Sequence, residues 1–70
     1  MRTLVRINGH MGYVDIPHEN GVPNPFTTPF QNHVRKWVLE MEVTDSADIV
    51  AGTVLNMVFT RDRIEILEES

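Results

Sequence analysis

Histidine and carboxylate side chains that could bind a metal ion gather near one part of the chain. His18 and Glu19 are adjacent, and His33 follows just beyond the same proline-rich region. A zinc site built by local geometry needs ligands one helical turn apart or on one face of a strand. The histidines, which also include His10, lack such spacing. Metal binding by His18, Glu19 and His33 is therefore our weakest functional hypothesis, and we expect no cofactor.

Paired carboxylates are the next residues that could do chemistry. Glu40 and Glu42 are separated by one residue, so they share one face of a strand, an arrangement that can serve acid–base catalysis. A solvent-facing acidic pair that discourages aggregation explains them more simply. The chain has no cysteine, neither Ser46 nor Ser70 lies in a nucleophile elbow, and there is no glycine-rich phosphate loop. We therefore expect no enzymatic activity.

Basic and aromatic residues raise the alternative of nucleic-acid binding. Arg2, Arg6 and Tyr13 are expected on one face of the first hairpin, and Arg35 lies close to the only tryptophan. Small barrels bind single strands with such combinations of cations and aromatic rings. The net charge of −4 gives an overall field that does not attract phosphate backbones. A small-barrel nucleic-acid-binding protein that uses these residues is therefore an alternative to our first hypothesis.

The segment 17–31 supports that first hypothesis, because it contains all four prolines and two of the three phenylalanines. Proline lowers the entropic cost of ordering a loop on binding, and aromatic side chains are frequent hot spots of interfaces. We expect a non-catalytic protein-binding module, which would act as an adaptor, regulator or inhibitor of a protein partner. The expected partner-binding residues are Val22, Phe26 and Phe30 in the loop, with Glu40 and Glu42 as an acidic surface.

The elements that position these residues begin with a β-hairpin. The residues Asn8-Gly9 between 2–7 and 10–16 favour a two-residue turn in which both positions have positive φ. This turn predicts that Ile7 lies opposite His10 and that Arg2 lies opposite Asp15, close enough to form an ion pair. One face of the hairpin is then apolar, and Gly12 is expected to mark a bulge or a close approach of another backbone. The residues of the apolar face are Val5, Ile7, Val14 and Ile16.

A central strand is predicted at 36–43, because its apolar residues fall at every second position. The preceding residues Thr28, Pro29 and Gln31 resemble the start of a capped helix. The sequence therefore predicts a short helical turn at 29–35 before the strand. The alternative is an α+β fold in which a helix spans 29–41 and packs on a β-sheet, since the apolar spacing there also fits a helix.

Two further strands complete the predicted fold. They span 49–59, with a bend at Gly52, and 63–67, with polar turns at 44–48 and 60–62 and a solvated tail at 68–70. Five short strands in one domain of 70 residues favour a mainly β, barrel-like fold of the SH3 or OB kind, because closure removes exposed sheet edges.

Composition bounds the remaining possibilities. The absence of cysteine excludes disulfides and fits the cytoplasm. The N-terminal residues have no long apolar run of the signal-peptide type, and no segment is apolar enough to cross a membrane. A chain this small buries a limited core, so we expect it to gain stability by forming a homo-oligomer, most simply a homodimer. A short acidic chain of this kind is consistent with an origin in a phage or mobile element.

Overall fold

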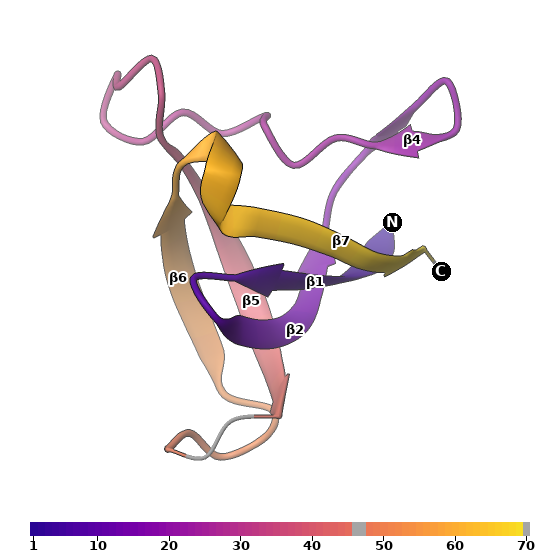
Figure 1. Cartoon of the computed structure of the whole chain (residues 1–70), viewed down its shortest axis with the longest axis vertical. Coiled ribbons are helices and arrows are strands. Elements are labelled where there is room, and N and C mark those ends of the chain that lie inside the picture. Colours follow the sequence, from indigo (N-terminus) through magenta and orange to yellow (C-terminus); the bar gives the residue numbers. More distant parts are fainter. Residues whose placement is uncertain (46–47, 70) are drawn as a thin grey trace.

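The computed structural model describes residues 1–45 and 48–69, and this part of the chain is mainly β (Figure 1). It contains a five-stranded antiparallel sheet, a separate two-stranded hairpin and one short 3-10 helix, with no α-helix in the described ranges. The sheet is formed by β1 (Arg2–Ile7), β2 (His10–Asp15), β5 (Trp37–Asp45), β6 (Val54–Phe59) and β7 (Ile64–Glu69). The hairpin is β3 (His18–Glu19) with β4 (Val22–Pro23), and the 3-10 helix is η1 (Arg61–Arg63).

The first hairpin has the predicted register. Asn8 and Gly9 both have positive φ, at 51° and 85°, as the two-residue turn requires. Ile7 lies opposite His10 and Arg2 opposite Asp15. The predicted apolar face is buried, with Thr3 beside it, so this prediction is confirmed. The predicted ion pair between Arg2 and Asp15 was wrong, because Arg2 reaches Glu42 on β5 instead.

Gly12 marks both features that the sequence suggested, a bulge and a close approach. The register between β2 and β5 shifts between Met11 and Gly12. A Cβ atom at Gly12 would lie 2.5 Å from the carbonyl oxygen of Glu42 and 2.6 Å from Cγ of Met41. No side chain fits in this space, so glycine lets β5 approach β2 closely at the centre of the sheet.

The central strand is confirmed, whereas the predicted helical turn at 29–35 and the alternative helix at 29–41 are wrong. Residues 28–30 pair instead with residues 36–38: the Val38 amide donates to the Thr28 carbonyl and the Phe30 amide to the Lys36 carbonyl. Gln31 has a φ of 44° and the next residue also has positive φ, which no right-handed helix accommodates. Pairing of the chain with β5 therefore overrides the local capping signal.

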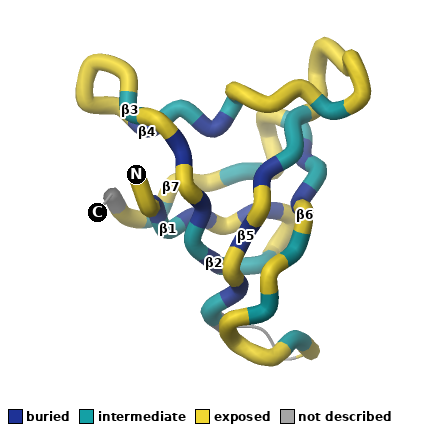
Figure 2. The backbone as a smooth tube through the Cα atoms, turned by 180° about the vertical axis from the view of Figure 1, so that it is seen from behind, coloured by how far each residue is buried: buried dark blue, intermediate teal, exposed yellow. Residues whose placement is uncertain are grey.

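The proline-rich segment contains a second hairpin that we did not predict. Its turn, Asn20-Gly21, repeats the signal of the first hairpin, with φ of 54° and 79°. The Asn24 amide donates to the Pro17 carbonyl and so ties the base of the hairpin. Figure 2 shows that this hairpin and the 29–36 loop form two exposed corners of the molecule.

The C-terminal strands differ from the prediction in their bounds. β6 begins at Val54 and not at residue 49, because Gly52 has a φ of 91° and the preceding residues form a turn. The predicted turn at 60–62 is the helix η1, and β7 continues through Glu69 where we expected a solvated tail. β5 extends into the predicted polar turn at 44–48, whose residues 46–47 lie outside the described residues, as does residue 70.

The predicted mainly β fold with five strands in one sheet is confirmed, but the sheet is not closed into a barrel. Its strand order is β6-β5-β2-β1-β7, which leaves β6 and β7 as the two edges. The helix η1 connects these edges, and near it the Asn8 amide Nδ2 donates to the Val58 carbonyl while the Asn8 backbone amide donates to the Arg63 carbonyl. The edges approach through Asn8 at this end, but the described residues include no β6–β7 ladder.

The core lies on the inner face of the twisted sheet. Buried residues come from the four strands β1, β2, β5 and β6 and from Ile16, with partly buried Phe26, Trp37, Ile49, Leu55 and Ile64 packed against them. No helix in the described part of the chain is long and apolar enough to cross a membrane.

Candidate functional site

The most distinctive side-chain cluster is the aromatic end, which consists of Phe26, Trp37, Phe59 and Arg61. Phe26 meets Trp37 edge to face, with ring centroids 4.7 Å apart, and lies 6.2 Å from the ring of Phe59. The guanidinium carbon of Arg61 is 4.0 Å from the centroid of Phe26 and 5.3 Å from that of Trp37. The Arg61 guanidinium therefore covers the rings of Phe26 and Trp37, and cation–π attraction keeps the charged group in place at the surface.

The proline-rich loop positions Phe26 in this cluster. Asn24 acts as a small clamp, since its side-chain oxygen accepts the Phe26 amide and its amide group donates to Glu19. Pro23 and Pro25 are buried on either side of Asn24. The loop is thus fixed to the body by its prolines and Phe26. Trp37 and Phe59 reach the cluster as opposite residues of β5 and β6.

The rim of the aromatic end is apolar and cationic. Val34, Arg35, Trp37, Thr60, Arg61 and Asp62 line a shallow hollow, and the Val34 side chain is 87% exposed. The Asp62 carboxylate has a partner within its own turn, because the Thr60 hydroxyl donates a hydrogen bond to it. That hydrogen bond, together with one from the Asp62 backbone and the nearby charge of Arg63, holds the pKa of Asp62 below its usual value. No described carboxylate forms an ion pair with Arg35 or Arg61.

Two of the three expected loop residues are half-buried, and the third is exposed. Val22 is exposed on the β3–β4 hairpin, and Phe26 is half-buried in the aromatic end. Phe30 is half-buried as well, in the 29–36 loop, and stacks on His33 with ring centroids 6.2 Å apart. A second hollow connects the hairpin to Arg61 along the proline-rich loop. Val22, Phe26 and Arg61 thus line one hollow, and Phe30 lies outside it in the 29–36 loop.

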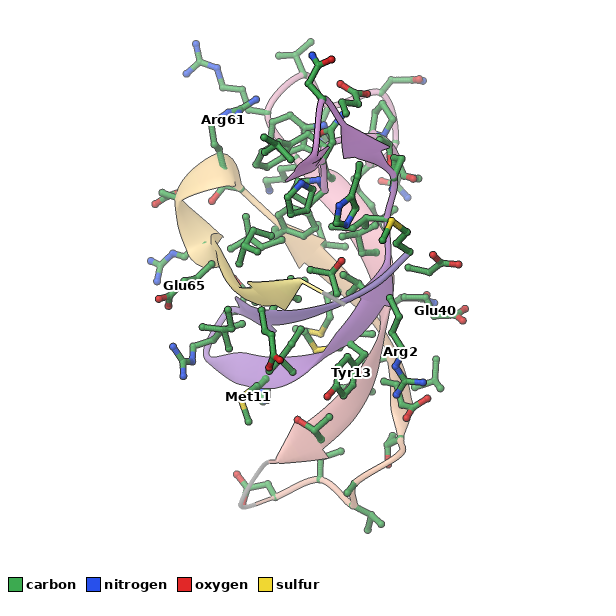
Figure 3. The ribbon with its side chains drawn as sticks, turned by 90° about the vertical axis from the view of Figure 1, so that its right-hand side faces the viewer. Arg2, Met11, Tyr13, Glu40, Arg61 and Glu65 are labelled. Atoms are coloured by element: carbon green, nitrogen blue, oxygen red, sulfur yellow. The ribbon has the colours of Figure 1, made fainter. Side chains whose placement is uncertain are left out.

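The acidic pair lies elsewhere, on the outer face of the sheet. Glu40 and Glu42 share this face, as their spacing indicated, and line a hollow with Arg2, Tyr13 and Val54. Figure 3 shows Arg61 at one end of the molecule and Arg2 beside Tyr13 and Glu40 further along the sheet. Arg2 donates to Glu42 at 3.0 Å and lies 4.3 Å above the ring of Tyr13.

The residues of the nucleic-acid hypothesis are not gathered in one place. Arg2, Arg6 and Tyr13 lie on the outer face of β1 and β2, whereas Arg35 lies on the rim of the aromatic end. The two hairpin arginines are also neutralised by cross-strand carboxylates, because Arg6 donates to Glu65 at 2.9 Å and Arg2 to Glu42.

The residues of the metal hypothesis each have separate neighbours. His18 Nε2 is 3.4 Å from the Thr3 hydroxyl, Glu19 accepts a hydrogen bond from Asn24, and His33 stacks on Phe30. Within residues 1–45 and 48–69, no group of at least three histidine, aspartate or glutamate side chains is arranged to hold a metal ion.

No family model matches the chain, and no curated protein and no solved structure is significantly similar to it. The functional interpretation therefore depends on the geometry. Sequence reasoning missed Trp37 and Arg61 as site residues. Nothing in the sequence connects Arg61 to Phe26, because the two meet only through the turn between β6 and β7.

Proposed function

We propose that this protein is a small non-catalytic protein-binding module whose binding surface is the aromatic end. The observation that supports this proposal is the Arg61 guanidinium held over Phe26 and Trp37 without an ion-pair partner among the described residues. A planar guanidinium on aromatic rings is preorganised for a carboxylate, since little of its freedom remains to be lost. Arginine and tryptophan are also the residue types that dominate binding energies at interfaces.

The chemistry of the rim indicates what kind of partner segment would fit. Val34 is exposed and apolar, and Arg35 and Arg61 supply positive charge on either side of the hollow. An extended segment with an acidic side chain next to an apolar one would satisfy both features. Val22 extends the surface along the hollow that contains Phe26 and Arg61, and Phe30 lies in the 29–36 loop that supplies Val34 and Arg35 to the rim. Glu40 and Glu42 lie on a different face and form a separate acidic surface.

Nucleic-acid binding at the same end is the second candidate. Four of the six basic residues lie around the turn between β6 and β7, in two adjacent hollows that contain Arg35, Lys36, Arg61 and Arg63. Against it, bases need open aromatic faces on which to stack. Phe26, Trp37 and Phe59 pack on one another, Arg61 covers Phe26 and Trp37, and Phe59 is buried.

Affinity capture from a native lysate with matched arginine variants tests the proposal. Arg61→Ser removes the stacked guanidinium, and Arg63→Ser removes a neighbouring exposed guanidinium that contacts neither ring. We expect a specific protein to be retained by wild type and Arg63→Ser after nuclease treatment. Arg61→Ser should retain roughly tenfold less, because a lost hot-spot contact costs about 1–2 kcal/mol. Circular dichroism must show that the three chains fold alike.

Two results would contradict the proposal. Equal capture by both variants would exclude the stacked guanidinium as the binding group. If nuclease treatment abolishes protein capture and both variants also capture less, the ligand of this surface is nucleic acid and not a protein.

A further inference from the structure

The edge strand β6 has backbone groups that no other strand of the described chain uses. Val43 on β5 directs both its amide and its carbonyl toward the β6 side, at Thr53 and Gly52. The amide of Val38 points away from β6 and donates to the Thr28 carbonyl. Because strand residues alternate in direction, odd-numbered residues of β5 bond to β6. Val54, Asn56 and Val58 lie opposite even-numbered residues of β5, so their amides and carbonyls point to the open edge.

The open part of this edge is Val54–Asn56. At Val58 the carbonyl already accepts the Asn8 side chain, and the hollow there is lined by Asn8, Thr60 and Arg63. No such partner lies against Val54 or Asn56 in the part of the chain that the structure describes. Val54 is 55% exposed and lies on the outer face, while the partly buried Leu55 faces the core.

β6 lacks the features that keep a sheet edge from pairing. Its residues, Val54 to Phe59, include no charge and no proline, although lysine, glutamate, proline or a bulge is the usual protection of an edge strand. β-branched and apolar residues make it favourable for strand addition. The other edge, β7, carries Glu65 and Glu68. The bare edge of β6 is therefore the edge that can accept another strand.

We propose that β6 pairs with β6 of a second copy of this chain, antiparallel about a twofold axis at Leu55. In this register Val54 lies opposite Asn56 of the partner, and the pair forms about four backbone hydrogen bonds. Leu55 meets its own counterpart at the axis, in the position where cross-strand side chains are closest. A ten-stranded sheet would run through both copies, as five strands from each.

A second copy fits this edge better than an unrelated segment. The twofold arrangement is self-complementary and closed, so it satisfies the edge without leading to fibres. Like charges are absent from the contact, because the nearest carboxylates, Glu40 and Glu42, lie on β5, one strand further in. Pairing of β6 with β7 of another copy would instead leave free edges and place carboxylates against the contact. The inference uses a surface separate from the aromatic end and does not depend on the proposed function.

Sedimentation equilibrium with matched valine variants tests the proposal. Val54→Lys places a charge on the open edge, and Val22→Lys makes the same change at a valine that is 62% exposed on the other hairpin. We expect wild type and Val22→Lys to form dimers of the 8.0 kDa chain as concentration rises. Val54→Lys should raise the dissociation constant by roughly tenfold or more, since the like charges would lie close together across the axis.

A backbone variant separates strand pairing from side-chain effects. Asn56→Pro removes an amide that points to the open edge, which a folded edge strand tolerates. We expect a folded monomer, as judged by circular dichroism and sedimentation. If Asn56→Pro does not fold, Val54→Lys still decides the question. A wild-type chain that stays monomeric up to about 1 mM, which is well above ordinary affinities, would overturn the proposal. Equal dimerisation of Val54→Lys, or loss of the dimer only in Val22→Lys, would overturn it too.

Discussion

The two edge strands of the sheet are built in opposite ways. β6 is anchored on its inner face by Met57 and Phe59, which are 8% and 2% exposed, yet its open edge carries no charge. β7 is shallow, with Ile66 37% exposed, but Glu65 and Glu68 protect it. The more deeply buried strand, β6, is thus the one whose edge lacks charge, and the shallower strand, β7, is the one whose edge is charged.

This contrast has a functional meaning. Burial of Met57 and Phe59 explains why β6 is a strand, but it does not explain Val54 and Asn56, whose side chains face solvent on the outer side. An uncharged open edge on a firmly held strand is unfavourable for a monomer, because such edges promote aggregation. It is an advantage when a second copy covers it, so the comparison supports the dimer proposed above.

The strongest test of the contrast compares the anchors of the two edges. Phe59→Ala should lower the free energy of unfolding by about 4 kcal/mol, as for other buried phenylalanines, and leave little folded protein. Ile66→Ala should cost only about 1 kcal/mol, because its side chain is already partly hydrated. Urea denaturation monitored by circular dichroism measures both. Similar losses for the two variants would show that the edges are equally anchored.

The junction between β2 and β5 supports both edges and is the next most sensitive position. Gly12→Ala places a Cβ against the Glu42 carbonyl and the Met41 side chain, so it should cost about 2–3 kcal/mol. The matched change Gly21→Ala meets no atom within 4 Å, but its φ of 79° makes it a test of turn strain alone, at roughly 1 kcal/mol. Thermal unfolding should rank Gly12→Ala as clearly worse, and the reverse order would refute the close approach at Gly12.

Removing the charges of β7 should make the two edges alike. Glu65→Gln with Glu68→Gln abolishes the ion pair with Arg6, at a cost of about 0.5 kcal/mol, and creates a second bare edge. Two bare edges allow growth beyond a dimer, so light scattering should detect larger species. The control Glu40→Gln with Glu42→Gln removes the same charge from the interior strand β5 and should not enlarge the assembly. Equal growth of both would attribute association to net charge.

The smallest expected effect concerns the turn that joins the two edges. Hydrogen bonds hold the pKa of Asp62 below its ordinary value of 3.8. The pKa of Asp15 is lowered in the same way by the hydrogen bond that its carboxylate accepts from the N-terminal amine. A lowered pKa means that each carboxylate stabilises the fold above pH ~4 and that this contribution is lost as pH falls through the lowered value. Carboxyl carbon NMR should find both midpoints below that of an unperturbed aspartate. Thr60→Val should return only Asp62 toward it.

Much of the fold was predictable because it depends on local signals. Asn8-Gly9 specified the register of the first hairpin, and alternation specified the buried face of β5. The predicted helix at 29–35 was wrong because residues 28–30 pair with residues 36–38, a contact that no local rule contains. Whether the predicted barrel-like sheet closes was not predictable for a similar reason, since closure depends on how far the twisted edges approach. Among the described residues the edges are bridged near Asn8 and form no β6–β7 ladder.

The candidate surfaces were harder to predict than the strands. Phe26 was expected to contribute, and it lies in the aromatic end, but its partner Arg61 is distant in sequence. Arg2 and Arg6 gave a basic pattern in sequence that cross-strand carboxylates neutralise in the fold. Whether an arginine is free to bind a ligand or forms an ion pair within the sheet thus depends on the strand register, which the sequence does not show directly.

The most direct test of the β6 dimer is an isotope-filtered NMR experiment on a mixture of labelled and unlabelled chain. In the proposed register, Leu55 is a non-hydrogen-bonded pair with itself, where the α-carbon atoms of the two strands are closest. We expect an intermolecular cross-peak between the α-protons of Leu55 in the two copies, and we expect Val54→Lys to abolish it. A dimer whose intermolecular cross-peaks come only from Phe26, Val34 or other residues of the opposite end would contradict the β6 dimer.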